Sequence, residues 1–237
     1  MRSGFGLLAR LSFLQDLASV FIANLNPDVI HNLGKYMAIK KIHHLSAVEE
    51  IEGDYLEFGV YTGSSFCHSI RCVKTYTKIY SSISSTRFYG FDSFEGFGEL
   101  ADNDEHPIYQ DVNFEASYEK VDSRIRRTAK EMDYQLIQGF FSETLALGAE
   151  SYGIKKSKII FIDSDTYTSA IDALLFVLPT IQEGSYIILD DYFAYKGKQS
   201  HGVARAFTEF VDQGKLSVRH VLNYGIGGVA FVISGMK

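Results

Sequence analysis

Cysteine is scarce in this sequence of 237 residues, which contains only Cys67 and Cys72. Two cysteines exclude the disulfide framework of a small secreted protein, and neither belongs to a C-x-x-C metal motif. Residues five positions apart on a helix point to different faces, so we expect two buried free thiols. Such thiols suit a reducing compartment, and we expect a cytoplasmic protein.

Clusters of basic residues are also few, and the net charge is −6 at pH 7. The densest positive stretches, residues 124–127 and Lys155-Lys156, are short and typical of solvated surfaces. Binding to nucleic acid relies on clustered Lys and Arg side chains near the phosphates. The composition therefore argues against nucleic acid as the main partner.

No apolar run is long enough to cross a membrane. The first 25 residues are rich in Leu and Phe, but Arg10, Gln15 and Asp16 interrupt them and no A-x-A cleavage site follows. These interruptions argue against both a membrane span and a secretory signal. The apolar residues recur instead at helical spacing, and we expect their face to pack on the body of the protein or on a second subunit of a homo-oligomer. These residues are Leu7, Leu11, Leu14, Leu17 and Phe21.

Internal repeats, low-complexity tracts and interdomain linkers are absent from the sequence. Residues 1–50 predict helices with a break near Asn26-Pro27-Asp28. From residue 51 onward, short apolar strands alternate with longer helical segments such as 64–76, 118–131 and 168–178, which is typical of a buried parallel sheet. We predict one α/β domain at 51–237, preceded by a helical N-terminal extension at 1–50 that packs on the domain or covers its site as a lid. The predicted strands are 55–59, 87–91, 134–138, 159–162 and 185–189, with an antiparallel hairpin of 216–222 and 228–233 closing a sheet of seven.

The most informative stretch is residues 54–65, where a short apolar run reaches a carboxylate and then two glycines before a helix. A strand, a glycine turn and a helix N-terminus form a nucleotide site at the carboxyl end of open α/β sheets. The spacing here is Glu57-x-Gly59-x-x-x-Gly63, not the G-x-G-x-x-G of a dinucleotide fold. A carboxylate before the first glycine suits a ligand with an ammonium group or hydroxyls, such as S-adenosylmethionine. A purely structural turn would show the same pattern.

Carboxylates follow three further predicted strands. Asp92 lies after the second strand, where an acidic residue often accepts hydrogen bonds from ribose hydroxyls; its alternative role is to cap the next helix. Asp163 follows the fourth strand, and Asp190 and Asp191 follow the fifth. Converging carboxylates repel one another unless a cation neutralises them, and Mg²⁺ with oxygen ligands is the natural cation.

These stretches together resemble the macrocin O-methyltransferase family of class I S-adenosylmethionine-dependent enzymes. The resemblance runs in family order over about residues 40–212. It implies a Rossmann-like class I methyltransferase fold and Mg²⁺-dependent methylation of a hydroxyl on a small molecule, typically a sugar attached to a natural product. The stretches that carry it are residues 53–63, 89–97, 104–107, 139–145, 163–167 (Asp-Ser-Asp-Thr-Tyr) and 189–192 (Leu-Asp-Asp-Tyr).

Carried over residue by residue, the resemblance implies a cofactor site, a metal site and a catalytic group. Asp163, Asp190 and Asp191 match the family's metal ligands, with Asp165 as the alternative to Asp163. Glu57, Gly59 and Gly63 match residues that line the methionine part of the cofactor, and Asp92 matches the residue at the ribose. The complete set of implied cofactor residues is Glu57, Phe58, Gly59, Tyr61, Gly63, Ser64, Ser65, Asp92, Ser93, Gly139, Phe140 and Asp163.

The sequence departs from the family at the histidine that resembles its general base. Glu115 stands at the nearest matching position, so Glu115 or His106 takes that role beside Asp163, or the base is lost. His106 next to Pro107 is equally compatible with an ordinary loop histidine. The acidic stretch 98–113 predicts a mobile substrate lid. Two alternatives remain open: a non-catalytic cofactor-binding protein of this fold, and an NAD-type oxidoreductase, which the missing G-x-G-x-x-G disfavours.

Overall fold

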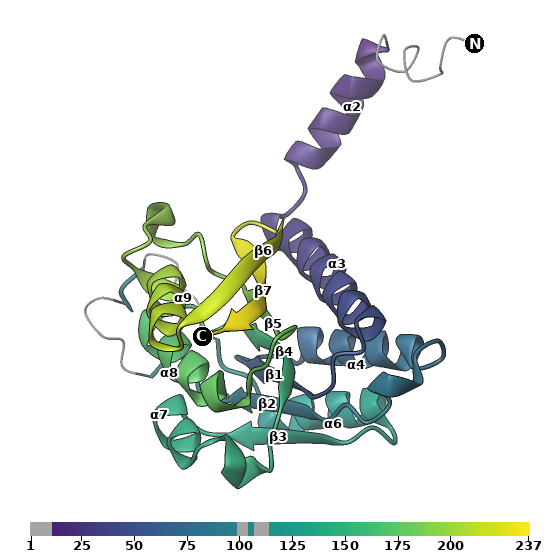
Figure 1. The fold of residues 1–237 in the computed structure, drawn as a ribbon. Coiled ribbons are helices and arrows are strands. Elements are labelled where there is room, and N and C mark those ends of the chain that lie inside the picture. The colour runs from purple at the N-terminus through teal and green to yellow at the C-terminus, as the bar shows by residue number, and fades with distance from the viewer. Residues whose placement is uncertain (1–10, 99–103, 107–113) are drawn as a thin grey trace.

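The computed structural model describes residues 11–98, 104–106 and 114–237, and its centre is a seven-stranded sheet (Figure 1). The strands are β1 (Asp54–Phe58), β2 (Phe88–Asp92), β3 (Tyr134–Gln138), β4 (Ser157–Ile162), β5 (Tyr186–Leu189), β6 (Leu216–Tyr224) and β7 (Gly228–Met236). Their order is β3-β2-β1-β4-β5-β7-β6; the first five are parallel, and β7 is antiparallel to both β5 and β6. All seven predicted strands are confirmed, with ends shifted by at most three residues.

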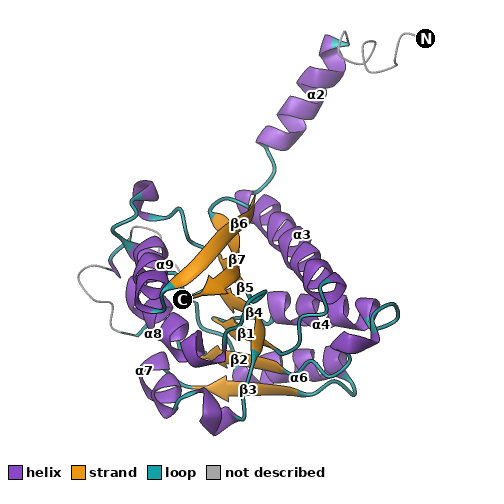
Figure 2. Cartoon of the chain, in the orientation of Figure 1, coloured by secondary structure: helices purple, strands orange, loops and turns teal. Residues whose placement is uncertain are grey.

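Helices cover both faces of this sheet (Figure 2). One face packs against α3 (Pro27–Val48), α4 (Ser64–Tyr76) and α6 (Tyr118–Ala129), and the other against α7 (Phe141–Thr144), α8 (Tyr167–Val177) and α9 (Gly202–Gln213). A further helix, α2 (Ser12–Ala23), precedes them. Short 3-10 turns are η1 (Ser81–Ile83), η3 (Leu145–Leu147), η4 (Ala149–Tyr152), η5 (Leu178–Thr180) and η6 (Tyr195–Gly197).

The core lies in two layers because successive strand residues point to opposite faces. In β1, Leu56 and Phe58 belong to the layer under α8 and α9, whereas Tyr55 belongs to the layer under α3, α4 and α6. Strands β1, β4 and β5 are buried along their whole length. Continuous apolar burial of this kind is what a parallel sheet covered on both faces requires.

Strand register sets the position of the predicted acidic residues. Phe58 of β1 pairs with Ile162 of β4, and Ile162 pairs with Leu189 of β5. The next residues therefore emerge side by side: the Asp163 N–H donates to the Phe58 carbonyl at 2.9 Å, and the Asp190 N–H donates to the Ile162 carbonyl at 3.0 Å. The strand order reverses between β1 and β4, which is where ligands bind in open α/β sheets.

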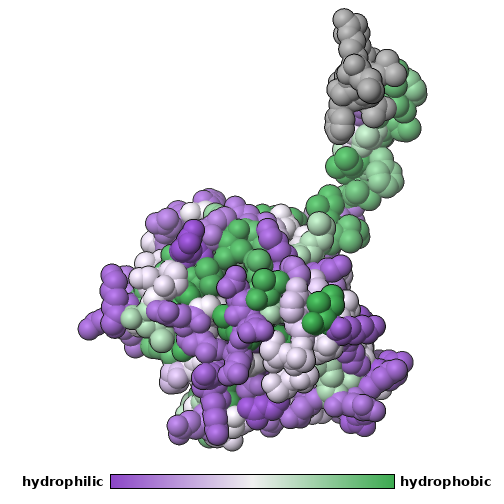
Figure 3. Space-filling view, turned by 45° about the vertical axis from the view of Figure 1, so that its right-hand side comes forward, coloured by the Kyte–Doolittle hydropathy of each residue, from purple (hydrophilic) through white to green (hydrophobic). Residues whose placement is uncertain are grey.

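The N-terminal helices differ sharply in packing. The predicted break is confirmed, because the Asn26 side chain caps α3 by accepting from the Asp28 N–H at 2.8 Å and Pro27 occupies the first helical position. α3 then contributes Ala38, Ile39 and Ile42 to the core. α2 instead projects away from the body, and none of its side chains is buried (Figures 1 and 3).

The expectation that the apolar face of α2 packs on the body is therefore wrong within this chain. The turn at residues 24–26 ends α2 and directs it away from the sheet, which leaves Phe13, Leu17 and Phe21 more than 60% exposed. Leu7 lies outside the described residues. Across the described part of the chain, no helix is both long enough and apolar enough to cross a membrane.

Candidate active site

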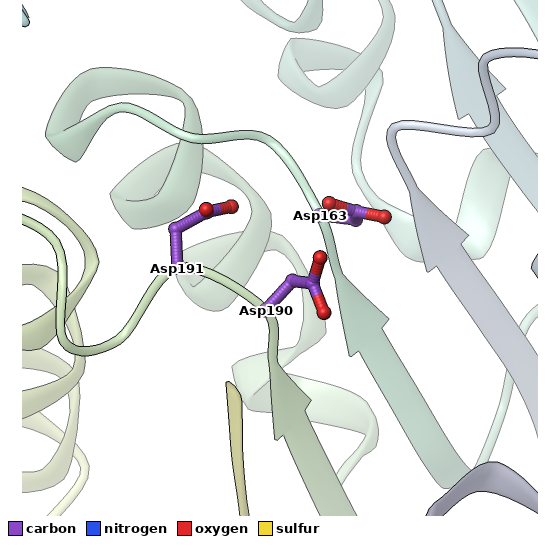
Figure 4. Close-up of side chains that lie close together, drawn as sticks. All are labelled: Asp163, Asp190 and Asp191. Atoms are coloured by element: carbon purple, nitrogen blue, oxygen red, sulfur yellow. The ribbon is translucent and has the colours of Figure 1, made fainter. Parts of the chain in front are cut away.

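The carboxylates of Asp163, Asp190 and Asp191 converge beyond the ends of β4 and β5 (Figure 4). One oxygen from each residue lies within 4.8 Å of the others. Among the described residues, this is the group of acidic, histidine and cysteine side chains with a spacing that could hold a metal ion. It contains Asp163, not Asp165, as the contribution from the loop after β4.

Three side chains from distant elements bind this group. The Lys35 ammonium of α3 contacts Asp163 Oδ2 at 2.8 Å and Asp190 Oδ2 at 2.7 Å. His31, one turn earlier on α3, places Nε2 3.0 Å from Asp190 Oδ2, and the Tyr224 hydroxyl at the end of β6 donates to Asp190 Oδ1 at 2.7 Å. Asp190 is therefore held on both oxygens, and Asp163 on one.

Burial and mutual repulsion shift the pKa values of the carboxyl groups in different directions. Burial would raise the pKa of Asp190, but Lys35 and His31 outweigh that effect and hold it below its ordinary value. Burial and the charge of Asp190 raise the pKa of Asp163 well above its ordinary value. Burial, then the charge of Asp165, raises the pKa of Asp191 in the same way. If all three carboxyl groups were ionised, the one lysine beside them would not neutralise their charge.

Asp191 carries the most direct sign of a missing partner. Its Oδ2 is buried and accepts no hydrogen bond, although a carboxylate oxygen in such a place normally has one. Asp165 also lies near, with a hydrogen bond to Asp191, and burial together with the charge of Asp190 raises the pKa of Asp165 to about 6. The donor set is all oxygen, with an orphaned acceptor and more carboxyl groups than cations, so these residues fit a hard divalent cation such as Mg²⁺.

The glycine loop after β1 passes directly beside this group. Gly59 has φ +88°, and a Cβ there would lie 1.9 Å from the Asp163 carbonyl oxygen, so only glycine permits the close approach of the two loops. Gly63, at φ +75°, is the N-cap of α4. The loop therefore presents the N-terminus of α4, including the half-buried Ser64, at the same edge as Asp163.

Glu57 points into the core layer rather than out of the loop. It is fully buried, and its two oxygens accept hydrogen bonds from the Tyr55 hydroxyl and from Ser65 Oγ, the latter at 2.6 Å. Burial raises the pKa of Glu57 to about 7 against these hydrogen bonds. Glu57 thus connects β1 to the first turn of α4 through its hydrogen bond with Ser65, and it supports the glycine loop from the core side.

Asp92 connects the loop after β2 to the glycine loop. Its Oδ2 accepts from the Tyr61 N–H at 2.7 Å, and its Oδ1 accepts from the Phe94 N–H at 2.7 Å. Residues 93–98 contain no helix, so Asp92 does not cap one directly after β2. Ser93 forms a local turn, donating from Oγ to the Gly96 carbonyl and accepting from the Glu95 N–H.

The remaining predicted cofactor residues divide between loop and core. The Gly139 N–H donates to the Asp92 carbonyl at 3.0 Å, and Phe140 follows as the N-cap of α7, so both lie at the carboxyl edge. The Phe58 side chain is fully buried and stacks on Phe91 with ring centroids 5.0 Å apart. Phe58 therefore has only its main chain available to a ligand.

The two candidate bases lie on segments that fold back over this edge. Asp104 is buried and accepts from the N–H groups of Tyr167 and Thr168, which anchors the chain near His106 to the N-terminus of α8. The His106 ring packs edge-on against Tyr195 at 5.1 Å. Glu115 is exposed and forms an isolated bridge with Glu95. Most of the predicted lid at 98–113 lies outside the described residues.

Lys35, His31 and Tyr224 are site residues that the sequence interpretation missed. His31 and Lys35 are four residues apart, so they share one face of α3. A lysine in line with the buried Ile39 and Ile42 was at most a weak signal, because α3 carries several other lysines and histidines. Tyr224, beside the Gly225 turn, gave no comparable signal.

Comparison with known proteins agrees with this geometry. Residues 35–222 match the family model described as Macrocin-O-methyltransferase (TylF). Mycinamicin III 3''-O-methyltransferase of Micromonospora griseorubida is 24% identical over 208 residues, which cover 79% of this chain and 78% of the relative. The 8-demethyl-8-(2,3-dimethoxy-alpha-L-rhamnosyl)-tetracenomycin-C 4'-O-methyltransferase of Streptomyces olivaceus is 26% identical over 180 residues, or 70% of this chain and 64% of the relative.

A solved structure shows the same fold. The crystal structure of CalS11, a calicheamicin methyltransferase, matches with a TM-score of 0.68 at 17% identity over 91% of this chain and 85% of that one. The matched range spans the glycine loop, Asp92 and the three aspartates, and a match to a methyltransferase family sets aside the oxidoreductase interpretation. The chain belongs to the macrocin O-methyltransferase family and is an S-adenosylmethionine-dependent O-methyltransferase.

Proposed function

We propose that this enzyme methylates a hydroxyl of a sugar or glycosylated natural product and requires Mg²⁺. The observation that carries the metal requirement is the orphaned, buried Oδ2 of Asp191 in a group of three aspartates beside the glycine loop. The acceptor class is supported by the two relatives, whose names describe methylation of mycinamicin III and of a rhamnosyl-tetracenomycin.

In this proposal the cofactor lies across the carboxyl ends of β1, β2 and β4. The loops after β1, β2 and β3 meet there, because Asp92 binds the Tyr61 N–H and the Gly139 N–H binds the Asp92 carbonyl. The loop after β4 joins them where the Asp163 carbonyl approaches Gly59. A carboxylate has about four acceptor positions, so the Asp92 side chain can hold the Tyr61 and Phe94 amides and still accept from the ribose hydroxyls. The glycine loop and the first turn of α4, held from behind by Glu57, receive the methionine part.

Asp163, Asp190 and Asp191 hold the metal in this proposal. When bound, Mg²⁺ supplies a positive charge that neutralises the carboxylates, lowers the pKa of an acceptor hydroxyl and orients it. The protein's own contribution is position: the register of β4 and β5 fixes Asp163 and Asp190 at adjacent points. His31 and Tyr224 then fix the orientation of Asp190.

Methyl transfer forms an oxygen–carbon bond, breaks the sulfonium–methyl bond and releases the hydroxyl proton. His106 and Glu115 are our candidates to take that proton. His106 is supported by the anchoring of its segment through Asp104 at the N-terminus of α8, two residues beyond Asp165. A base must reach the hydroxyl within hydrogen-bond distance, and substrate closure completes such contacts in many enzymes.

We also propose that α2 packs on a second copy of the chain in a homo-oligomer. Its exposed Phe13, Leu17 and Phe21 form an apolar surface that has no partner among the described residues of this chain (Figure 3). A cytoplasmic location is consistent with Cys67 and Cys72, which are buried free thiols, and burial raises the pKa of Cys72 to about 11.

The experiment that tests the proposed function is titration calorimetry with S-adenosylhomocysteine, first with Mg²⁺ and then with excess chelator. We expect cofactor binding in both conditions and an additional metal-dependent heat that is lost in Asp191→Ala. Hydroxylated glycosides are then screened as acceptors with labelled S-adenosylmethionine. If the cofactor binds without any metal-dependent heat, the methyltransferase assignment stands and the proposed Mg²⁺ requirement is wrong.

A further inference from the structure

The Lys35 ammonium lies on the same oxygens that a metal ion would use. Its Nζ is 2.8 Å from Asp163 Oδ2 and 2.7 Å from Asp190 Oδ2, and the side chain is only 10% exposed. Within the described ranges, Lys35 of α3 makes the ion pairs to the aspartate group, and His31 of the same helix adds a hydrogen bond to Asp190.

The packing of α3 fixes this lysine in place. A Cβ on Gly34 would lie 2.5 Å from the Gly225 nitrogen, so the helix sits against the backbone of the β6–β7 turn. His31 Nδ1 accepts from the Ile226 N–H at 3.2 Å, and the Lys35 ammonium lies 5.7 Å from the centre of the Phe161 ring. The aliphatic part of the Lys35 side chain is therefore buried, and its ammonium group has a defined position.

A divalent ion and this ammonium cannot share the two oxygens at low cost. Mg²⁺ requires oxygen ligands at about 2.1 Å, which would bring it within a few ångströms of a positive Nζ on the same atoms. Two cations at that separation repel strongly in a partly buried site. Either the lysine head moves away when the ion enters, or the ion binds weakly.

We propose that Lys35 competes with the divalent ion for Asp163 and Asp190, holding these two aspartates together in the metal-free enzyme and lowering the affinity for the ion. The proposal rests on the metal site proposed above. Asp191 Oδ2 has no partner, so it receives the ion without displacing any group. His31 and Tyr224 keep Asp190 oriented when Lys35 leaves.

The test is a Mn²⁺ titration of the full chain, followed by the electron paramagnetic resonance signal of the free ion. We expect Lys35→Met to bind Mn²⁺ at least tenfold more tightly than the wild type, because a fixed positive charge has been removed. Lys158→Met is the matched control: Lys158 is also buried, but it lies at the opposite end of β4 and donates to Thr86. Its Mn²⁺ affinity should stay within about twofold of the wild type, because screening and distance weaken its effect.

A second variant keeps the test decisive if Lys35→Met does not fold, which its melting curve and its affinity for S-adenosylhomocysteine will show. Lys35→Arg keeps the charge and pairs well with two carboxylates, so we expect Mn²⁺ to bind no more tightly than in the wild type. Tighter binding in Lys35→Arg overturns the proposal. Equal Mn²⁺ affinity in Lys35→Met and the wild type also overturns it. In that case, weaker Mn²⁺ binding by Asp191→Asn would still support the metal site. Absence of Mn²⁺ binding in every variant removes the metal site itself, and this proposal with it.

Discussion

The two ends of the sheet both hold charged side chains that are wholly or partly buried, but in different proportions. At the amino end, the Asp54 carboxylate accepts three hydrogen bonds from Arg87, and the buried Lys158 lies near it. At the carboxyl end, four aspartates of the loops after β4 and β5 meet one lysine and one histidine. The amino end pairs its buried carboxylate with cations, and the carboxyl end has more carboxyl groups than cations.

This comparison shows which feature marks the active site. Perturbed pKa values occur at both ends, since burial lowers the pKa of Lys158 to about 8 and raises that of Asp165 to about 6. Among the described residues, only the carboxyl end combines like charges from separate strands with a buried carboxylate oxygen that has no partner. The orphaned acceptor, more than any pKa shift, indicates that a ligand completes the arrangement.

The largest expected effect tests whether the excess charge serves catalysis. Asp163→Asn should lower the methyl-transfer rate by roughly a hundredfold to a thousandfold, because the variant weakens the proposed cation site beside the glycine loop. The affinity for S-adenosylhomocysteine should change by less than about threefold, since the loops proposed to bind it remain in place. Turnover and calorimetry on the same preparation measure the two quantities. Unaltered turnover would show that the aspartates play no part in catalysis.

Glu57, near the carboxyl end of β1, is a further buried carboxyl group that ionises only at a cost in stability. Burial raises its pKa from 4.5 to about 7 in the folded protein, so the folded state holds a proton that the unfolded state releases. Its contribution to stability is complete below pH 4.5, decreases as the pH rises to about 7 and is constant above that. The total change is roughly 3 kcal/mol.

The measurement is urea unfolding of the wild type and Glu57→Gln at several pH values. The difference in unfolding free energy between them isolates this residue from the other carboxyl groups. We expect the unfolding free energy of Glu57→Gln to increase relative to that of the wild type as the pH rises from 4.5 to 7. A difference that is independent of pH would mean that Glu57 is ionised in the folded protein.

Neutralising one aspartate at each end should shift stability in opposite directions. Asp54→Asn should reduce the unfolding free energy by about 1–2 kcal/mol at pH 7; the loss is moderate because Arg87 is partly exposed. Asp191→Asn should raise it by about 1 kcal/mol, since it removes a carboxyl group that burial and the nearby Asp165 and Asp190 keep from ionising at low cost, and whose Oδ2 has no partner. Urea denaturation without added metal measures both. Changes of the same sign would contradict the comparison.

The sequence was sufficient for the sheet and for the aspartates, because both depend on local pattern. Fully buried strands read as apolar runs, and parallel neighbours bring Asp163 and Asp190 to one edge whatever the loops do. The sequence was insufficient for the direction in which the Glu57 and Phe58 side chains point. A strand that is buried on both faces has no alternation of polar and apolar residues, so the pattern does not separate side chains that face the loop from those that face the core. The contact of Lys35 with Asp163 joins residues 128 positions apart and depends on how α3 crosses the sheet.

The smallest effect expected concerns a charged pair at the amino end that is not buried. Lys156 Nζ lies 4.0 Å from Glu52 Oε2, and the two side chains are 57% and 77% exposed. Glu52→Gln should shift the melting temperature by less than about 1 °C, because water and salt screen an exposed pair. Calorimetry at low and high salt measures it, with Asp54→Asn as the buried counterpart at the same edge. A shift in melting temperature as large as that of Asp54→Asn would mean that the contribution of a charged side chain to stability depends on its position along the sheet and not on its burial. Equal stability of Glu52→Gln and the wild type would assign the contrast between the two ends to their buried groups alone.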